Sequence, residues 1–174
     1  MSIFKLKLVV LGMAGVGKTN IIQRFLKDEF ITNFKLTIGI DIYTKYFEYE
    51  KGKIVLLSIW DIAGQSRFED IRKTFYNNAD GAIIVFNPFD MASYSKAKQL
   101  VDEIRDFIGD EIPFVLIGNK IQLTNEFENI IDRANILDFI YNEDGFYIEV
   151  SPNSEANIDL AFKELIQRIV NSSR

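Results

Sequence analysis

The sequence contains no cysteine and no histidine among its 174 residues. Without cysteine there are no disulfides, thiolate metal sites or thiol nucleophiles. Without histidine there is no imidazole acid–base catalysis, and the commonest zinc ligand is missing. Any hydrolysis by this chain must therefore depend on positioning, a metal ion and electrostatic stabilisation.

Long apolar runs are also missing, and no stretch approaches the length needed to span a bilayer. The N-terminal residues MSIFKLKLVV run into a predicted strand rather than forming a signal peptide. The second residue is serine and the last residues are NSSR, so the sites of myristoylation and prenylation are absent. We expect a cytoplasmic monomer without a lipid anchor of its own.

Basic residues are outnumbered, with 20 Lys and Arg against 25 Asp and Glu, for a net charge of −5. This balance argues against nucleic-acid binding, which needs a basic face to neutralise phosphates. It leaves room for a nucleotide, because a local nest of backbone N–H groups can bind phosphate. The length and the 48% hydrophobic content predict a single domain over residues 1–174.

Short apolar runs alternate with helical stripes along most of the chain. Runs beginning at Leu6, Ile54, Ala82, Phe114 and Phe146 are typical of buried strands, and residues 40–49 predict an edge strand that forms a hairpin with the next one. Stripes with a 3.6-residue period predict helices within 93–108, 130–141 and 158–169. The pattern predicts an α/β fold with a mostly parallel sheet and helices on both faces.

The segment LGMAGVGKTN follows the first strand and opens a helix. Its glycines allow successive backbone N–H groups to point at phosphate oxygens, Lys18 can reach the terminal phosphates, and the Thr19 hydroxyl can ligate magnesium. The motif predicts a nucleotide phosphate site in a P-loop NTPase fold, and the apolar runs together with residues 40–49 predict its sheet of six strands with one antiparallel edge strand. The predicted contacts are Gly12, Ala14, Gly15, Val16, Gly17, Lys18, Thr19 and Asn20.

The segment WDIAGQSRFED supplies a second group of candidate residues after the strand that begins at Ile54. Asp61 ends that strand, where its carboxylate can hold magnesium opposite Thr19. The backbone N–H of Gly64 can approach a γ-phosphate, and Gln65 can orient an attacking water. The D-x-x-G pattern alone is a weak indication of a nucleotide site, but its spacing from the phosphate loop makes the indication much stronger.

Over nearly its whole length the chain resembles the Ras superfamily of small GTPases, in particular the Ras and Rab branches. The resemblance rests on GMAGVGKT, KLTIGID, WDIAGQ, GNKIQ and EVSPN in family order. It implies that Thr37 coordinates magnesium with Thr19 and Asp61, and that Gln65, Lys18 and Thr37 serve catalysis. Phe30 would pack edge-on against guanine, and Phe34 stands where many members have a tyrosine over the phosphates.

The resemblance also implies a function. The protein would bind GTP or GDP with Mg²⁺, hydrolyse GTP slowly, and act as a molecular switch whose segments KLTIG and GQSRF respond to the γ-phosphate. Its partners would be effector, GAP and exchange-factor proteins. Ala14 stands where Ras has a glycine, and its methyl group narrows the room for an arginine supplied by a GAP.

The two loops that read guanine in the family depart from its pattern. Gln122 replaces an aspartate that accepts from guanine N1–H and the 2-amino group, so one neutral acceptor remains. Pro152 replaces an alanine whose N–H donates to guanine O6, and proline has no N–H. The predicted base contacts are Asn119, Lys120, Gln122, Ser151, Pro152 and Asn153.

Three interpretations remain open at the level of sequence. Guanine still binds through the other groups; or base selectivity is relaxed towards hypoxanthine and xanthine, which lack a 2-amino group; or the protein is a nucleotide-holding scaffold with little turnover. A P-loop kinase is disfavoured because the acceptor-substrate and lid segments are not found in the sequence.

Overall fold

A computed structural model describes residues 3–36, 39–121, 131–152 and 154–173. Within these residues seven strands form one sheet in the order β2-β3-β4-β1-β5-β6-β7. The strands are β1 (Phe4–Gly12), β2 (Thr32–Leu36), β3 (Ile40–Glu50), β4 (Lys53–Ile62), β5 (Gly81–Phe86), β6 (Phe114–Asn119) and β7 (Phe146–Val150). The helices are α1 (Lys18–Leu26), α2 (Glu69–Arg72), α3 (Met91–Ile108), α4 (Arg133–Asn142) and α5 (Glu155–Ser172), and 3-10 turns η1 (Ser66–Phe68) and η2 (Lys73–Tyr76) flank α2.

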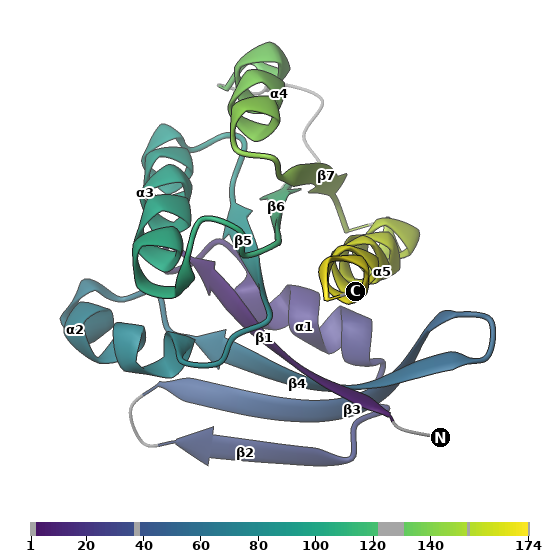
Figure 1. Cartoon of the computed structure of the whole chain (residues 1–174). Helices are drawn as coiled ribbons and strands as arrows, with labels where there is room; N and C mark the ends of the chain where they lie inside the picture. The colour runs from purple at the N-terminus through teal and green to yellow at the C-terminus, as the bar shows by residue number, and fades with distance from the viewer. Residues whose placement is uncertain (1–2, 37–38, 122–130, 153, 174) are drawn as a thin grey trace.

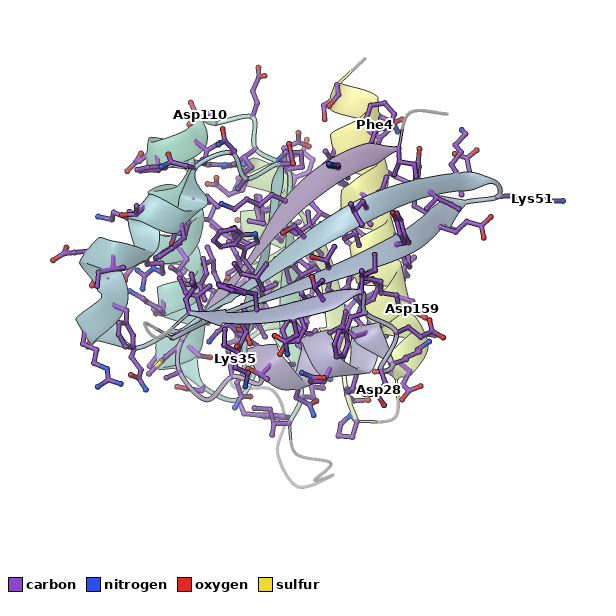
Figure 2. The ribbon with its side chains drawn as sticks, turned by 90° about the horizontal axis from the view of Figure 1, so that it is seen from below. Phe4, Asp28, Lys35, Lys51, Asp110 and Asp159 are labelled. Carbon is purple, nitrogen blue, oxygen red and sulfur yellow. The ribbon has the colours of Figure 1, made fainter. Side chains whose placement is uncertain are left out.

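The predicted α/β fold class is confirmed, but the prediction of six strands is wrong. β3 pairs antiparallel with both β2 and β4, whereas the pairs from β4 to β7 are all parallel. The strand expected at the edge, β3, therefore lies one position inside it, and β2 forms the edge (Figures 1 and 2). β2 escaped detection because four of its five residues are exposed, so it has no buried face to produce an alternating pattern.

Two apolar cores lie on opposite faces of the sheet, because successive side chains of a strand point to opposite sides. In β1, Leu8 and Val10 face the helices α1 and α5, whereas Val9 and Leu11 face α3 and α4. Figure 1 shows α1 and α5 on one side of the sheet and α2, α3 and α4 on the other. All four of these β1 side chains are at most 1% exposed. Burial on both faces explains the continuous apolar runs.

The parallel strands bring the predicted motifs to one edge of the sheet. β1 ends at Gly12, β4 ends just after Asp61, β6 ends at Asn119 and β7 ends at Val150. The register pairs Val10 with Asp61 and Asn119 with Val150, so these ends lie at similar heights. Ligands of open α/β sheets bind at this carboxyl edge. No helix within the described ranges is long and apolar enough to cross a membrane.

Candidate functional site

The loop between β1 and α1 folds around the amine of Lys18. Gly15 and Gly17 have φ angles of 83° and 92°, in the left-handed region that favours glycine. Lys18 Nζ donates to the carbonyl oxygens of Gly12 at 3.0 Å and Met13 at 3.3 Å. Burial lowers the pKa of Lys18, although the charge of Asp61 acts in the opposite direction. A positive charge is thus fixed inside a loop of backbone N–H groups at a helix N-terminus, where phosphate binds favourably.

Thr19 and Asp61 meet where α1 begins and β4 ends. The Thr19 hydroxyl donates to Asp61 Oδ2 at 2.6 Å, and Asp61 is only 6% exposed. Burial raises the pKa of the Asp61 carboxyl, against the opposing effects of Thr19 and Lys18. The described residues contain no cluster of three or more acidic side chains that could cage a metal ion. A hydroxyl and one carboxylate instead suit Mg²⁺, which completes its shell with waters and substrate phosphates.

The segment after β4 crosses directly over the phosphate loop. A Cβ added to Gly64 would lie 2.2 Å from the carbonyl oxygen of Gly12 and 2.6 Å from the backbone nitrogen of Ala14. Glycine is therefore required for this close approach of two backbones. A cavity of about 440 Å³ joins the two segments, and its walls include Ala14, Lys18, Thr19, Asp61, Gly64 and Gln65.

A second cavity of about 470 Å³ lies beside the first, at the ends of β6 and β7. Asn119, which is 5% exposed, donates from Nδ2 to the carbonyl oxygen of Val16 at 2.9 Å and so links β6 to the phosphate loop. Lys120 pairs with Glu149 at 3.0 Å, and its backbone N–H donates to Val150 at 2.7 Å. The walls include Gly15, Gly17, Asn20, Asn119, Ile121 and Pro152.

Several predicted residues are placed elsewhere or are not described. Thr37, Gln122 and Asn153 lie outside the described residues. Phe30 is 39% exposed and packs edge-on against Tyr43 with ring centroids 6.0 Å apart, and Phe34 is 60% exposed on β2. Neither aromatic ring lines the two cavities as the described residues form them.

The structure adds Arg24 to the second cavity, a residue that sequence reasoning missed. Arg24 lies in α1 and donates from Nη2 to the carbonyl oxygens of Ser151 at 3.0 Å and Pro152 at 3.3 Å. One signal for it was available: Arg24 follows Asn20 by four residues, which places both on one face of the helix. The contact with Ser151, 127 residues away, could not be inferred from that spacing.

Comparison with known proteins finds one family over most of the chain. The model of the Ras family matches residues 7–171. The chain is 33% identical over 163 residues to Ras-related protein Rab-11A of Dictyostelium discoideum, covering 94% of this chain and 75% of that protein. It is 35% identical over 167 residues to Ras-related protein RABA5b of Arabidopsis thaliana (95% and 75%), and 34% identical over 168 residues to GTP-binding protein YPT53 of Saccharomyces cerevisiae (94% and 76%).

Proposed function

Because the chain belongs to the Ras family, it is a small GTP-binding switch protein that hydrolyses GTP, and we propose that its two adjoining cavities hold the nucleotide. The cavity at Lys18, Thr19 and Asp61 takes the phosphates, and the cavity at Asn119 and Pro152 takes the base. Residues 1–174 act as one domain in this proposal. The observation that carries it is the hydrogen bond from Thr19 to the buried carboxylate of Asp61, next to the amine of Lys18.

The proposal assigns metal binding to Thr19, Thr37 and Asp61. A bound Mg²⁺ would neutralise negative charge on the β- and γ-phosphate oxygens. Thr19 and Asp61 already lie within hydrogen-bond distance of each other, so one small cation can be reached by both oxygens after the hydroxyl proton turns away. Lys18 supplies a second positive charge from within the phosphate loop.

Hydrolysis is assigned to the positioning of water. Gln65 lies in the wall of the phosphate cavity next to Gly64, where its amide can donate to and accept from a water molecule. The chain has no histidine or cysteine to act as a base. The rate of hydrolysis therefore depends on the alignment of the attacking water and on neutralisation of the charge on the phosphates. Lys18 and Thr37 complete the proposed catalytic set.

Partner binding is assigned to the segments on either side of this cavity. The backbone N–H of Ala63 donates to the carbonyl oxygen of Gly39 at 3.0 Å, so the segment after β2 and the segment after β4 are coupled. A γ-phosphate that draws in either segment would change both surfaces together. Effectors, GAPs and exchange factors would read this change, and the Ala14 methyl group would restrict a GAP arginine.

A single-turnover experiment tests the proposal. We expect Gln65→Leu to reduce release of γ-phosphate from bound GTP by roughly a hundredfold, in line with the loss of a positioning group, while GDP affinity is retained. Gln167→Leu is a matched control, because Gln167 lies in α5 about 18 Å along the helix axis from its N-terminal end at the nucleotide edge. Unchanged release in Gln65→Leu would remove Gln65 from the mechanism, and wild-type protein that binds no GTP would overturn the proposal.

A further inference from the structure

The positively charged side chain of Arg24 lines the base cavity together with Pro152, a residue of the loop after β7 that has no backbone N–H to donate. Arg24 donates from Nη2 to the carbonyl oxygens of Ser151 at 3.0 Å and Pro152 at 3.3 Å. Arg24 is half-buried and lines the same cavity as Asn20, Asn119 and Pro152. It therefore contacts the loop and borders the space assigned to the base.

Without Arg24, this part of the wall would offer mainly hydrogen-bond acceptors. Pro152 has no backbone N–H, and the carbonyl oxygens of Ser151 and Pro152 only accept. The backbone N–H of Ser151 already donates to Ser154 Oγ at 2.6 Å, and the two serine hydroxyls lie 3.2 Å apart. A wall of acceptors favours an amino group on the ligand and disfavours a carbonyl group.

Arg24 reverses this polarity. A guanidinium carries five N–H donors and no acceptor, and it remains charged at any physiological pH. Nη2 donates to the carbonyl oxygens of Ser151 and Pro152, and the Ser151 oxygen also accepts from the backbone N–H and the hydroxyl of Ser154, so both oxygens compete less well for a ligand amino group. The remaining guanidinium N–H groups make the wall a cationic donor, and hydrogen bonds from a charged donor are stronger than neutral ones.

We propose that Arg24 makes the base cavity selective for purine nucleotides that carry a 6-oxo group, as in guanine and hypoxanthine, over those that carry a 6-amino group, as in adenine. This inference rests on the proposed function, which places the base in this cavity. Arg24 positions the loop after β7 by donating to the carbonyl oxygens of Ser151 and Pro152. Its guanidinium also supplies the N–H donor that Pro152 lacks. GDP and IDP both carry the 6-oxo group, so Arg24 does not distinguish between them.

Competition binding measures this selectivity directly. Unlabelled GDP, IDP and ADP compete against a fluorescent GDP in the presence of magnesium, with the wild type and Arg24→Gln. We expect Arg24→Gln to lower the GDP:ADP and IDP:ADP affinity ratios by about tenfold, the loss of one charge-assisted hydrogen bond. The GDP:IDP ratio should stay within about twofold, since both bases carry the 6-oxo group. A general loosening of the loop would lower all three affinities and leave their ratios unchanged.

Two further variants separate charge from geometry and from position on the helix. Arg24→Lys keeps the charge but replaces the planar fork with a point donor, so its loss of selectivity should be intermediate. Lys27→Gln removes a cation from the C-terminal end of α1, where Lys27 pairs with Asp159 of α5 at 3.1 Å on the surface. We expect the wild-type ratios in Lys27→Gln.

A double-mutant cycle with Pro152→Ala tests the compensation itself. Alanine restores a backbone N–H to the wall, so Arg24→Gln should cost less selectivity in the Pro152→Ala background than in the wild type. Equal costs in both backgrounds, or unchanged GDP:ADP ratios in Arg24→Gln, would overturn the role of Arg24. If the wild type bound neither GDP nor IDP, the proposed function would fail instead, so the two failures are distinguishable.

Discussion

Arg72 and Glu103 form a buried ion pair that joins α2 to α3. Arg72 Nη2 lies 2.9 Å from Glu103 Oε2, and Arg72 Nε lies 3.1 Å from Oε1. The side chains are 2% and 13% exposed, and the Tyr76 hydroxyl donates to the same carboxylate at 2.7 Å. The pair anchors the C-terminal end of α2, whereas Ser66 and Arg67, which follow Gln65, are exposed. We therefore expect any movement of the segment that contains Gln65 to be confined to residues before Arg72.

Removing the Glu103 carboxylate from this pair should strongly reduce the free energy of unfolding. Glu103→Ala leaves the Arg72 guanidinium buried without its counter-charge, and we expect a loss of about 3 kcal/mol in the free energy of unfolding. Arg72→Met should cost less, because Glu103 is closer to solvent and methionine fills the space of the arginine stem. Urea denaturation of the nucleotide-free protein measures both.

The surface pair Glu164–Arg168, four residues apart on α5, provides the control for this measurement. Glu164→Gln should change the free energy of unfolding by less than about 1 kcal/mol, as for other exposed pairs. Equal effects of Glu103→Ala and Glu164→Gln would contradict the view that Arg72 depends on its partner.

The same carboxylate should make stability depend on pH. Burial raises the pKa of Glu103, but the hydrogen bonds from Arg72 and Tyr76 outweigh it and hold the pKa below its ordinary value of 4.5. The unfolded chain then binds the proton more tightly than the folded one, so ionised Glu103 stabilises the fold above pH 4.5. This contribution is lost as the pH falls through the pKa of the folded state.

Glu103→Gln isolates this effect, because glutamine keeps the shape of the side chain and cannot ionise. The difference in free energy of unfolding between wild type and Glu103→Gln should be largest at neutral pH and should shrink below pH 4.5. Urea denaturation curves, recorded at a series of pH values without metal or nucleotide, measure this difference in the free energy of unfolding. A difference that stays constant down to about pH 3 would show that Glu103 does not titrate with folding.

Gly64→Ala should impair hydrolysis through backbone displacement alone. The added Cβ would meet the carbonyl oxygen of Gly12 at 2.2 Å, and backbone cannot give way as a flexible side chain does. Gln65 must then move away from the phosphate loop, and a displacement of about 1 Å can cost roughly a hundredfold in rate. We expect γ-phosphate release to fall by this order while GDP binding, which depends on Lys18 and Thr19, falls much less.

The neighbouring variant Ser66→Ala removes an exposed hydroxyl two residues later without a backbone clash, and it should hydrolyse GTP as the wild type does. If Gly64→Ala kept the wild-type rate, the two backbones would be free to separate without cost, and the proposed approach of Gly64 to the γ-phosphate would be wrong.

Sequence alone predicts the features that depend on local pattern. The phosphate loop and Asp61 were predicted because their spacing and the flanking strands encode the chemistry within a few residues. β2 was missed because an exposed edge strand has no buried side to create a period. Arg24 and the pair of Arg72 with Glu103 were missed because their partners lie far away in the chain, and a lone arginine in a helical stripe carries no sign of which carbonyl or carboxylate it meets.

Asn119 lines the base cavity and bonds to the phosphate loop, so its loss should weaken the binding of both the base and the phosphates. Its amide donates to the buried carbonyl oxygen of Val16 at 2.9 Å, and a Cβ on Gly17 would lie 2.5 Å from that same amide nitrogen. Asn119→Ala leaves the Val16 carbonyl without this donor and opens space beneath the phosphate loop. We expect a loss of about 1–3 kcal/mol in the free energy of unfolding and GDP release faster by at least about tenfold.

Asn77→Ala is the matched control, since Asn77 also donates its amide to a backbone carbonyl, that of Thr74 at 3.2 Å, but on the exposed surface. It should change both quantities little, because water replaces an exposed hydrogen bond. Stopped-flow release of fluorescent GDP, measured well below the unfolding temperature, separates ligand loss from unfolding. Stability lost without faster GDP release would mean that Asn119 supports the fold of β6 and leaves the phosphate loop in place, which contradicts a link between the two cavities.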